Sequence, residues 1–263
     1  MSIFEALVLG VIQGLTEFLP VSSSGHLELA NALFGIKEGN NLAFAMAVHG
    51  GTVLSTIVVF RREIGRLIAG FFRFRLNEET LFLINIGISL IPILFVGLFF
   101  QDQIEELFSS NLLLVGAMLM LTAVLLTFSH YAKPRHRPIT PRSAFMIGLA
   151  QALAVIPGLS RSGATISAGL LQGIKREEVA KFSFLMVLIP IIGMNLLEIV
   201  KGDMASTSEE VWVIVTGFLA AFLTGTFACR LMIRLVNQGK LLWFAVYCAI
   251  VGFSAVMYSM FFA

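Results

Sequence analysis

Two stretches of this chain, 138 residues apart, repeat one another without a gap. Each is an apolar segment that breaks at a proline, continues through serines and reaches a glycine. Residues 13–27 read QGLTEFLPVSSSGHL and residues 151–165 read QALAVIPGLSRSGAT. The repeat indicates an internal duplication, with a first half at about 1–137 and a second half at about 138–263. The positions at which the two copies differ are therefore where we expect the chemistry.

The composition excludes a soluble globular protein. The 263 residues are 57% hydrophobic and 13% charged, with a mean hydropathy of +0.91, so we expect an all-α integral membrane protein that forms a single membrane domain. The net charge is only +2 and no nucleic-acid signature is present, so we expect no nucleic-acid partner. Six apolar stretches are long enough to cross a bilayer as helices: 42–60, 80–100, 111–129, 178–200, 209–232 and 241–262.

Two further segments are apolar but unsuited to crossing. Residues 3–20 are interrupted by Gln13, Glu17 and Pro20, and the following segment, 24–35, is too short. Residues 143–173 repeat this pattern. Non-helical backbone persists at membrane depth only where it is buried in protein or lines a wet cavity. We therefore expect two re-entrant helix pairs in addition to the six transmembrane helices.

The charges between the apolar stretches predict an orientation, since Lys and Arg favour the cytoplasmic side. The basic connections are 61–79 (Arg61, Arg62, Arg66, Arg73, Arg75), 130–142 (Lys133, Arg135, Arg137, Arg142) and 230–240 (Arg230, Arg234, Lys240). The acidic connections are 101–110 (Asp102, Glu105, Glu106) and 201–210 (Asp203, Glu209, Glu210, against Lys201). Three spans separate the helix pairs, so the first pair enters from outside and the second from the cytoplasm, with both termini outside. This is an inverted-topology repeat, in which the re-entrant tips meet near the midplane.

Gln13 and Glu17 are four residues apart and share one face of a helix. A carboxylate within the membrane costs about 2.5–3.5 kcal/mol on insertion scales, so it usually faces a cavity and has a function. Together the two side chains offer oxygen ligands to a hard cation such as Mg²⁺ or Ca²⁺. The alternative is a polar pair that bonds to the broken backbone nearby. The second copy keeps Gln151 but has Val155 in place of the acid.

The first break continues as Ser22-Ser23-Ser24-Gly25-His26. Hydroxyls and free amide N–H groups at a helix N-terminus form an anion site, and His26 could reach that anion as a nucleophile or as a general acid or base. The alternative is a helix cap beside a structurally hydrogen-bonded histidine.

The second break places Arg161 where the first has Ser23, between Ser160 and Ser162 and close to Thr165. A planar guanidinium flanked by hydroxyls suits a phosphate, which it binds in bidentate fashion. The alternative is a structural ion pair between Arg161 and Glu17. One copy thus supplies an acid, hydroxyls and a histidine, and the other a cation and hydroxyls, which indicates phosphoester chemistry.

At these residues the sequence resembles the bacterial undecaprenyl-diphosphate phosphatase family, also called the bacitracin-resistance protein family. Its two signatures, (Glu/Gln)-x-x-x-Glu and P-G-x-S-R-S-x-x-T, read QGLTE at 13–17 and PGLSRSGAT at 157–165. The resemblance covers essentially the whole chain. It implies a multi-pass enzyme of the bacterial inner membrane that removes the terminal phosphate of undecaprenyl diphosphate and recycles the lipid carrier for peptidoglycan synthesis. It also implies a divalent cation, Mg²⁺ or Ca²⁺, and an active site that faces the periplasm.

The resemblance implies roles for the same residues. Glu17 and Gln13 would be the metal ligands or would assist proton transfer. Ser23 or His26 would be the nucleophile or the acid/base. The phosphate ligands would be Arg161, Ser160, Ser162, Thr165, Ser22 and Ser24. Gln13 carries no charge, so Glu17 would be the sole acidic metal ligand. Direct attack by water stays open. The expected partners are a polyprenyl diphosphate and membrane lipids, with a homodimer left open. The rival function is a polyprenyl-phosphate flippase or transporter, because opposed re-entrant hairpins are also a transporter architecture.

Overall fold

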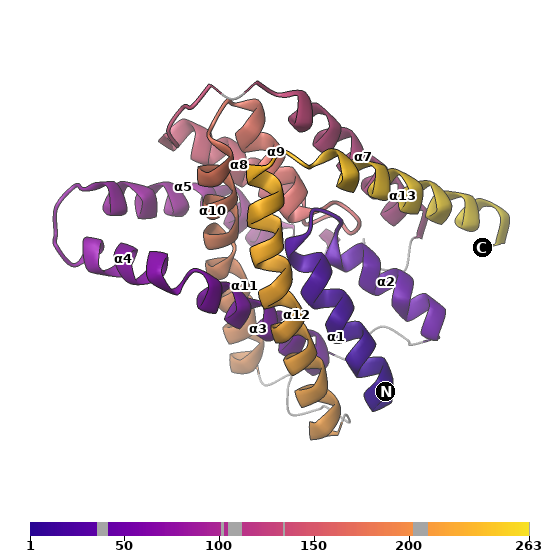
Figure 1. Ribbon diagram of the computed structural model, residues 1–263. Coiled ribbons are helices and arrows are strands. Elements are labelled where there is room, and N and C mark those ends of the chain that lie inside the picture. Colours follow the sequence, from indigo (N-terminus) through magenta and orange to yellow (C-terminus); the bar gives the residue numbers. More distant parts are fainter. Residues whose placement is uncertain (36–41, 101–102, 105–111, 134, 202–209, 263) are drawn as a thin grey trace.

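The computed structural model describes residues 1–35, 42–100, 103–104, 112–133, 135–201 and 210–262. Within these ranges every regular element is a helix, and the backbone forms only an isolated bridge, between Arg137 and Ile174 (Figure 1). The prediction of an all-α protein is confirmed for these residues.

Five helical segments in the described ranges are long and apolar enough to cross a membrane. They are α5 (Glu78–Phe99), α7 (Leu112–Tyr131), α10 with α11 (Arg176–Met186 and Leu188–Lys201), α12 (Val211–Asn237) and α13 (Leu242–Phe262). The break between α10 and α11 falls at Val187, next to Pro190 in the first turn of α11. Proline has no N–H to donate to the carbonyl four residues earlier, so it is tolerated only near a helix start.

The sixth predicted span ends in a bend. Helix α3 (Leu42–Val59) covers 42–60, and α4 (Arg61–Phe71) leaves it at an angle of 74°. The connection predicted at 61–79 is therefore wrong in part, because its first half is helical. Leu67 and Gly70 are buried on one face of α4, while the arginines lie on the other. Counting α3 with α4 as one bent span gives six.

The two predicted helix pairs are present as helix–break–helix segments. The first consists of α1 (Ile3–Phe18) and α2 (Ser23–Phe34), and the second of α8 (Pro141–Leu153) and α9 (Arg161–Leu171). Helices α1 and α8 each begin with a capping box, formed by Ser2 with Glu5 and by Thr140 with Ser143. That these pairs are re-entrant, and that the halves are inverted, stays a prediction.

The packing relates the two halves. Helix α1 lies against α12, and α8 lies against α5 (Figure 1). Gly10 and Gly148, which occupy the same place in the repeat, make these approaches close. A Cβ at Gly10 would lie 2.5 Å from the carbonyl oxygen of Gly217, and one at Gly148 would collide with the carbonyl of Ser89. Helices α7 and α13 pack side by side, and α7 also contacts both α2 and α9. Both breaks therefore lie beside α7.

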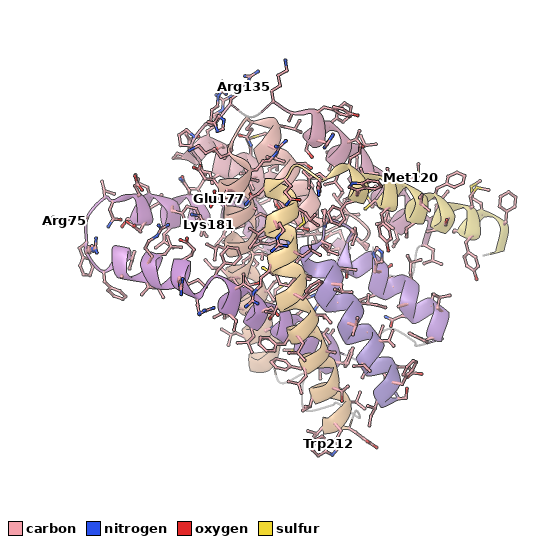
Figure 2. All side chains as sticks on the ribbon, viewed as in Figure 1. Arg75, Met120, Arg135, Glu177, Lys181 and Trp212 are labelled. Carbon is pink, nitrogen blue, oxygen red and sulfur yellow. The ribbon has the colours of Figure 1, made fainter. Side chains whose placement is uncertain are left out.

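Part of the predicted topology rests on residues outside the described ranges: Asp102, Glu105, Glu106, Asp203 and Glu209. The side chain of Lys201 is likewise not described. Among the described residues, Arg75 and Arg135 of two basic connections lie at the left and upper edges of the molecule, away from Trp212 at its lower end (Figure 2). The orientation of these connections in a membrane stays a prediction.

Candidate active site

The two breaks lie against one another, as the sequence predicts. Ser162 Oγ donates a hydrogen bond of 3.3 Å to the carbonyl oxygen of Leu19. Gly25 faces Gly158, so closely that a Cβ on Gly25 would lie 3.2 Å from the Gly158 Cα. Gly158 has a φ of +89° and packs onto the backbone of Val115 in α7, where a side chain has no room. Helices α2 and α9 consequently both begin at this contact.

Glu17, at the end of α1, is the centre of the cluster. Its Oε1 accepts a hydrogen bond of 2.5 Å from Arg161 Nη2. Its Oε2 accepts one of 2.7 Å from Ser23 Oγ and one of 3.1 Å from Gln13 Nε2. The carboxylate is 8% exposed and the Arg161 side chain 15%, so this is an ion pair largely removed from solvent. The acid of the first half and the cation of the second therefore meet directly.

Gln13 is fully buried on α1, and its Oε1 has no hydrogen-bond partner among the described residues. An orphaned amide oxygen beside a carboxylate is a ligand type that Mg²⁺ and Ca²⁺ accept. The described residues contain no cluster of three His, Cys, Asp or Glu side chains that could hold a metal ion. Gln13 and Glu17 offer two oxygen ligands, so a cation held here would have to take its remaining ligands from a bound phosphate and water; cation binding stays a prediction. Gln151, the counterpart of Gln13, is also buried, with both amide atoms unpaired in the described structure.

Arg161 is the first residue of α9 and has donors to spare. While Nη2 contacts Glu17, Nη1 is buried with no partner among the described residues. Leaving such a donor unpaired costs about 1–3 kcal/mol, more for a charged group. An anion that reached this nitrogen would remove the penalty. The ion pair with Glu17 that the sequence offered as the alternative is present, and the binding of a phosphate by Nη1 stays a prediction.

The serines of both breaks cap their helices. Ser22 Oγ accepts from the Gly25 N–H at 3.3 Å, and Ser160 Oγ accepts from the Gly163 N–H at 3.1 Å. In each break the capping hydroxyl also shares a hydrogen bond of 3.3 Å with the serine two residues on, Ser24 or Ser162. Caps hold the N-terminal N–H groups of a helix in place and leave its positive dipole end facing the break. Direct contact of these hydroxyls with a phosphate stays a prediction.

Thr165 is fully buried, and its hydroxyl is already used. It donates to the carbonyl oxygen of Arg161 at 2.9 Å and shares a hydrogen bond of 2.6 Å with Ser183 Oγ of α10. Thr122 of α7 accepts from the backbone N–H of Ser160 at 3.0 Å. Ser183 and Thr122 therefore fix the start of α9. Neither was singled out from the sequence, where the only available signal is a hydroxyl inside an apolar span.

His26 turns away from the Glu17–Arg161 pair in this structure. Its Nδ1 lies 2.8 Å from the carbonyl oxygen of Ser22, and its Nε2 lies 2.8 Å from the hydroxyl of Tyr247 in α13. The two rings stack, with centroids 5.6 Å apart and planes within 12°. A carbonyl can only accept, so Nδ1 carries the proton, and in the neutral ring Nε2 accepts from the tyrosine. Tyr247 was missed in the sequence because nothing local to it points to a histidine 221 residues away.

The chain matches a known family over nearly its whole length. A model of the family described as bacitracin resistance protein BacA matches residues 6–254. A protein of Bacteroides fragilis named undecaprenyl-diphosphatase is 54% identical over 260 residues, which cover 97% of this chain and 98% of that protein. One of the same name from Parabacteroides distasonis is 55% identical over 96% of each chain. Another, from Methanococcus vannielii, is 38% identical over 97% of this chain and 99% of its own.

Proposed function

Because this chain belongs to the bacitracin resistance protein BacA family, we propose that it hydrolyses undecaprenyl diphosphate to undecaprenyl phosphate and phosphate. The relatives named undecaprenyl-diphosphatase align with it from end to end. The observation that carries the proposal is the contact of Glu17 with both Arg161 and Ser23. It joins both signature motifs in one cluster of acid, hydroxyl and guanidinium.

The anion-binding part of the site is the pair of helix starts. Helices α2 and α9 begin at Ser23 and Arg161, and their starts lie beside each other at the meeting of the breaks. Two helix N-termini and a guanidinium supply positive potential from fixed groups. Such preorganised groups stabilise the charge that spreads over a transferred phosphoryl group. We place the terminal phosphate of the substrate against the free Nη1 of Arg161.

Ser23 is the nucleophile that the geometry favours. Its hydroxyl already donates to Glu17 Oε2 at 2.7 Å, which is the contact of a nucleophile with its general base. In this scheme Ser23 Oγ bonds to the terminal phosphorus, its proton passes to Glu17, and the bridging P–O bond breaks so that undecaprenyl phosphate leaves. Water then releases phosphate and restores the serine. In the alternative scheme Glu17 takes the proton of a water that attacks directly. His26 would first have to give up its bond to Tyr247.

Gln13 and Glu17 would hold the divalent cation, Mg²⁺ or Ca²⁺, through the free Oε1 of Gln13 and the Glu17 carboxylate. When bound, the cation would withdraw charge from the phosphate oxygens. The role of Gln13 in this chain is to present its amide oxygen, because its Nε2 is already engaged by Glu17.

Several helices are long and apolar enough to cross a membrane, which supports a multi-pass membrane protein. We place it in the bacterial inner membrane with the α1–α2 pair open to the periplasm, which is the side that the charge distribution of its connections favours. The lipid tail would then lie among the helices while the headgroup reaches the two breaks. We treat the two halves as an inverted repeat, with support from the matched approaches of Gly10 and Gly148.

Phosphate release from undecaprenyl diphosphate by the detergent-purified protein tests the proposal. The assay is run with Mg²⁺, with Ca²⁺ and with a chelator, on the wild type and on Glu17→Ala and Arg161→Ala. Glu5→Gln is the matched control, because Glu5 lies on the same helix but outside the cluster. We expect cation-dependent release that both alanine variants lose and the control keeps. Absence of release from folded wild type, with transfer of a labelled polyprenyl phosphate across liposomes, would instead establish the flippase alternative.

A further inference from the structure

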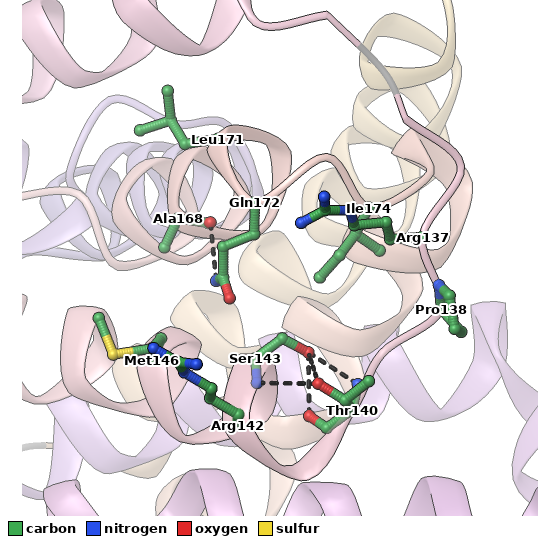
Figure 3. Close-up of a pocket in the computed structure, with 10 residues that line it drawn as sticks. All are labelled: Arg137, Pro138, Thr140, Arg142, Ser143, Met146, Ala168, Leu171, Gln172 and Ile174. Carbon is green, nitrogen blue, oxygen red and sulfur yellow. Dashed lines mark hydrogen bonds between the residues drawn. The ribbon is translucent and has the colours of Figure 1, made fainter.

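A basic pocket lies at the opposite end of α9 from Arg161. It has a volume of about 750 Å³ and is formed by the connection before α8, the first turns of α8 and the last turn of α9. Arg137 and Arg142 enter it from two sides, and the amide of Gln172 lies between them in the view of Figure 3. Eleven residues of helix at 1.5 Å each place this pocket roughly 15 Å from the start of α9. It is therefore separate from the Glu17–Arg161 cluster.

Among the described residues, the two arginines of the pocket have no carboxylate partner. The ion pairs of the described part of the chain involve Arg66, Arg161 and Lys175, and neither Arg137 nor Arg142 takes part in one. The pocket also includes the first turn of α8, whose dipole adds positive potential. Two unpaired guanidinium groups that face one cavity favour an anion, and their planar forks suit a phosphate.

Apolar side chains also line the pocket. Met146 and Leu171 line it and are 47% and 52% exposed. A soluble anion would gain nothing from these side chains. A ligand that has a phosphate at one end and a hydrocarbon chain at the other would bury them while it satisfies the arginines.

The polar and basic residues of this pocket are not repeated in the first half of the chain. At the equivalent positions of the first half, Arg142 is replaced by Phe4, Ser143 by Glu5 and Gln172 by Phe34. An excess of Arg on one side of a membrane protein sets its orientation wherever the residues stand in short connections. The role of arginines in setting the orientation therefore does not explain why Arg137 and Arg142 line a single cavity together with apolar side chains.

We propose that this pocket binds the phosphate headgroup of a membrane lipid, with Arg137 and Arg142 on the phosphate and the hydrocarbon chain along Met146 and Leu171. The shared chemistry is a lipid phosphate, supplied either by an anionic glycerophospholipid or by a polyprenyl phosphate. In the orientation predicted from the charges, the pocket opens to the cytoplasmic leaflet, opposite the face proposed for hydrolysis. The site does not depend on the hydrolytic activity.

The test measures lipid binding to the purified full-length protein by native mass spectrometry. All samples carry Arg161→Ala, which weakens phosphate binding at the Glu17–Arg161 cluster, so that the measured binding reports on the pocket. Arg137→Gln/Arg142→Gln is compared with Arg73→Gln/Arg75→Gln, which makes the same change of charge at exposed residues of another connection that do not line the pocket. The probes are phosphatidylglycerol, undecaprenyl phosphate and inorganic phosphate.

We expect at least tenfold weaker lipid binding in the pocket variant and a change of less than twofold in the control. If the protein with an intact pocket retains one of the two lipids better than the other, this supports the site. The lipid that is retained better, phosphatidylglycerol or undecaprenyl phosphate, identifies the source of the phosphate. Equal losses in both double variants would overturn the proposal, because general surface charge would then account for the binding. Inorganic phosphate that competes as well as the lipids do would also overturn it, because the apolar side chains would contribute nothing.

Discussion

The ion pair between Glu17 and Arg161 admits two accounts, one structural and one catalytic, and a double-mutant cycle separates them. Arg161→Met leaves a carboxylate that is 8% exposed without its cation. Removing one partner of a buried pair typically costs about 3–5 kcal/mol. Glu17→Gln keeps the shape, but its amide nitrogen must face either Arg161 or the donors Ser23 and Gln13. An unsatisfied group of this kind costs about 1–3 kcal/mol.

The double variant Glu17→Gln/Arg161→Met removes both charges and should be less destabilised than the sum of the single changes. Coupling energies between residues in contact run to about 3 kcal/mol, and we expect a value near the top of that range. The free energy of unfolding is measured for all four proteins by titrating detergent micelles with sodium dodecyl sulfate. Phosphate release from undecaprenyl diphosphate is measured on the same samples.

The catalytic account expects stability to be largely restored in the double variant while phosphate release stays at least about a thousandfold below wild type. Recovery of activity together with stability would refute the site assignment, because the pair would then only hold the two halves together. Strictly additive losses of stability would refute the contact itself.

The geometry leads to further tests of the site and of the packing. Ser23→Ala should lower kcat at least a hundredfold. Tyr247→Phe, which keeps the stacking on His26, should lower kcat less than tenfold. A larger loss of kcat in Tyr247→Phe than in Ser23→Ala, measured in steady-state assays, would assign the attack to His26. A chelator should abolish phosphate release without moving the thermal midpoint, because the proposed cation takes most of its ligands from phosphate and water; a large fall in the midpoint would indicate a structural metal. Gly148→Leu should destabilise the protein by about 1–3 kcal/mol, because the new side chain would collide with the Ser89 backbone. Gly87→Leu is the control, because Gly87 has open space around it and the change should not destabilise the protein. Equal free energies of unfolding for the two variants would contradict the close approach of α8 to α5.

The apolar spans and the two helix breaks could be predicted from local patterns in the sequence. Apolar length indicates the spans, because a helix needs about 20 apolar residues to cross a bilayer. A proline followed by serines and glycine indicates the two breaks, because the proline interrupts helical hydrogen bonding and the hydroxyl caps the next helix. The contact of Glu17 with Arg161 was only the alternative interpretation of the sequence, and it agrees with the cost of an unpaired charge at membrane depth.

The residues that were missed depend on long-range packing. Tyr247 reaches His26 only because α13 packs against α7 and passes the first break, where Cys248 Sγ also contacts the carbonyl oxygen of Pro20 at 3.5 Å. No period or motif within 241–262 encodes that neighbour. Thr122 and Ser183 are single hydroxyls in apolar helices, which more often bond to their own backbone. Helix α4 was overlooked because its many arginines resemble a solvated connection.

The most direct test of the central claim is single-turnover phosphate release from saturating undecaprenyl diphosphate by Arg161→Met, with substrate binding measured on the same sample. A guanidinium that stabilises a transferred phosphoryl group is worth about 10³–10⁵ in rate. The account predicts that the folded variant, with substrate bound, releases phosphate at least a thousandfold more slowly than wild type. A rate within tenfold of wild type at full occupancy would contradict it.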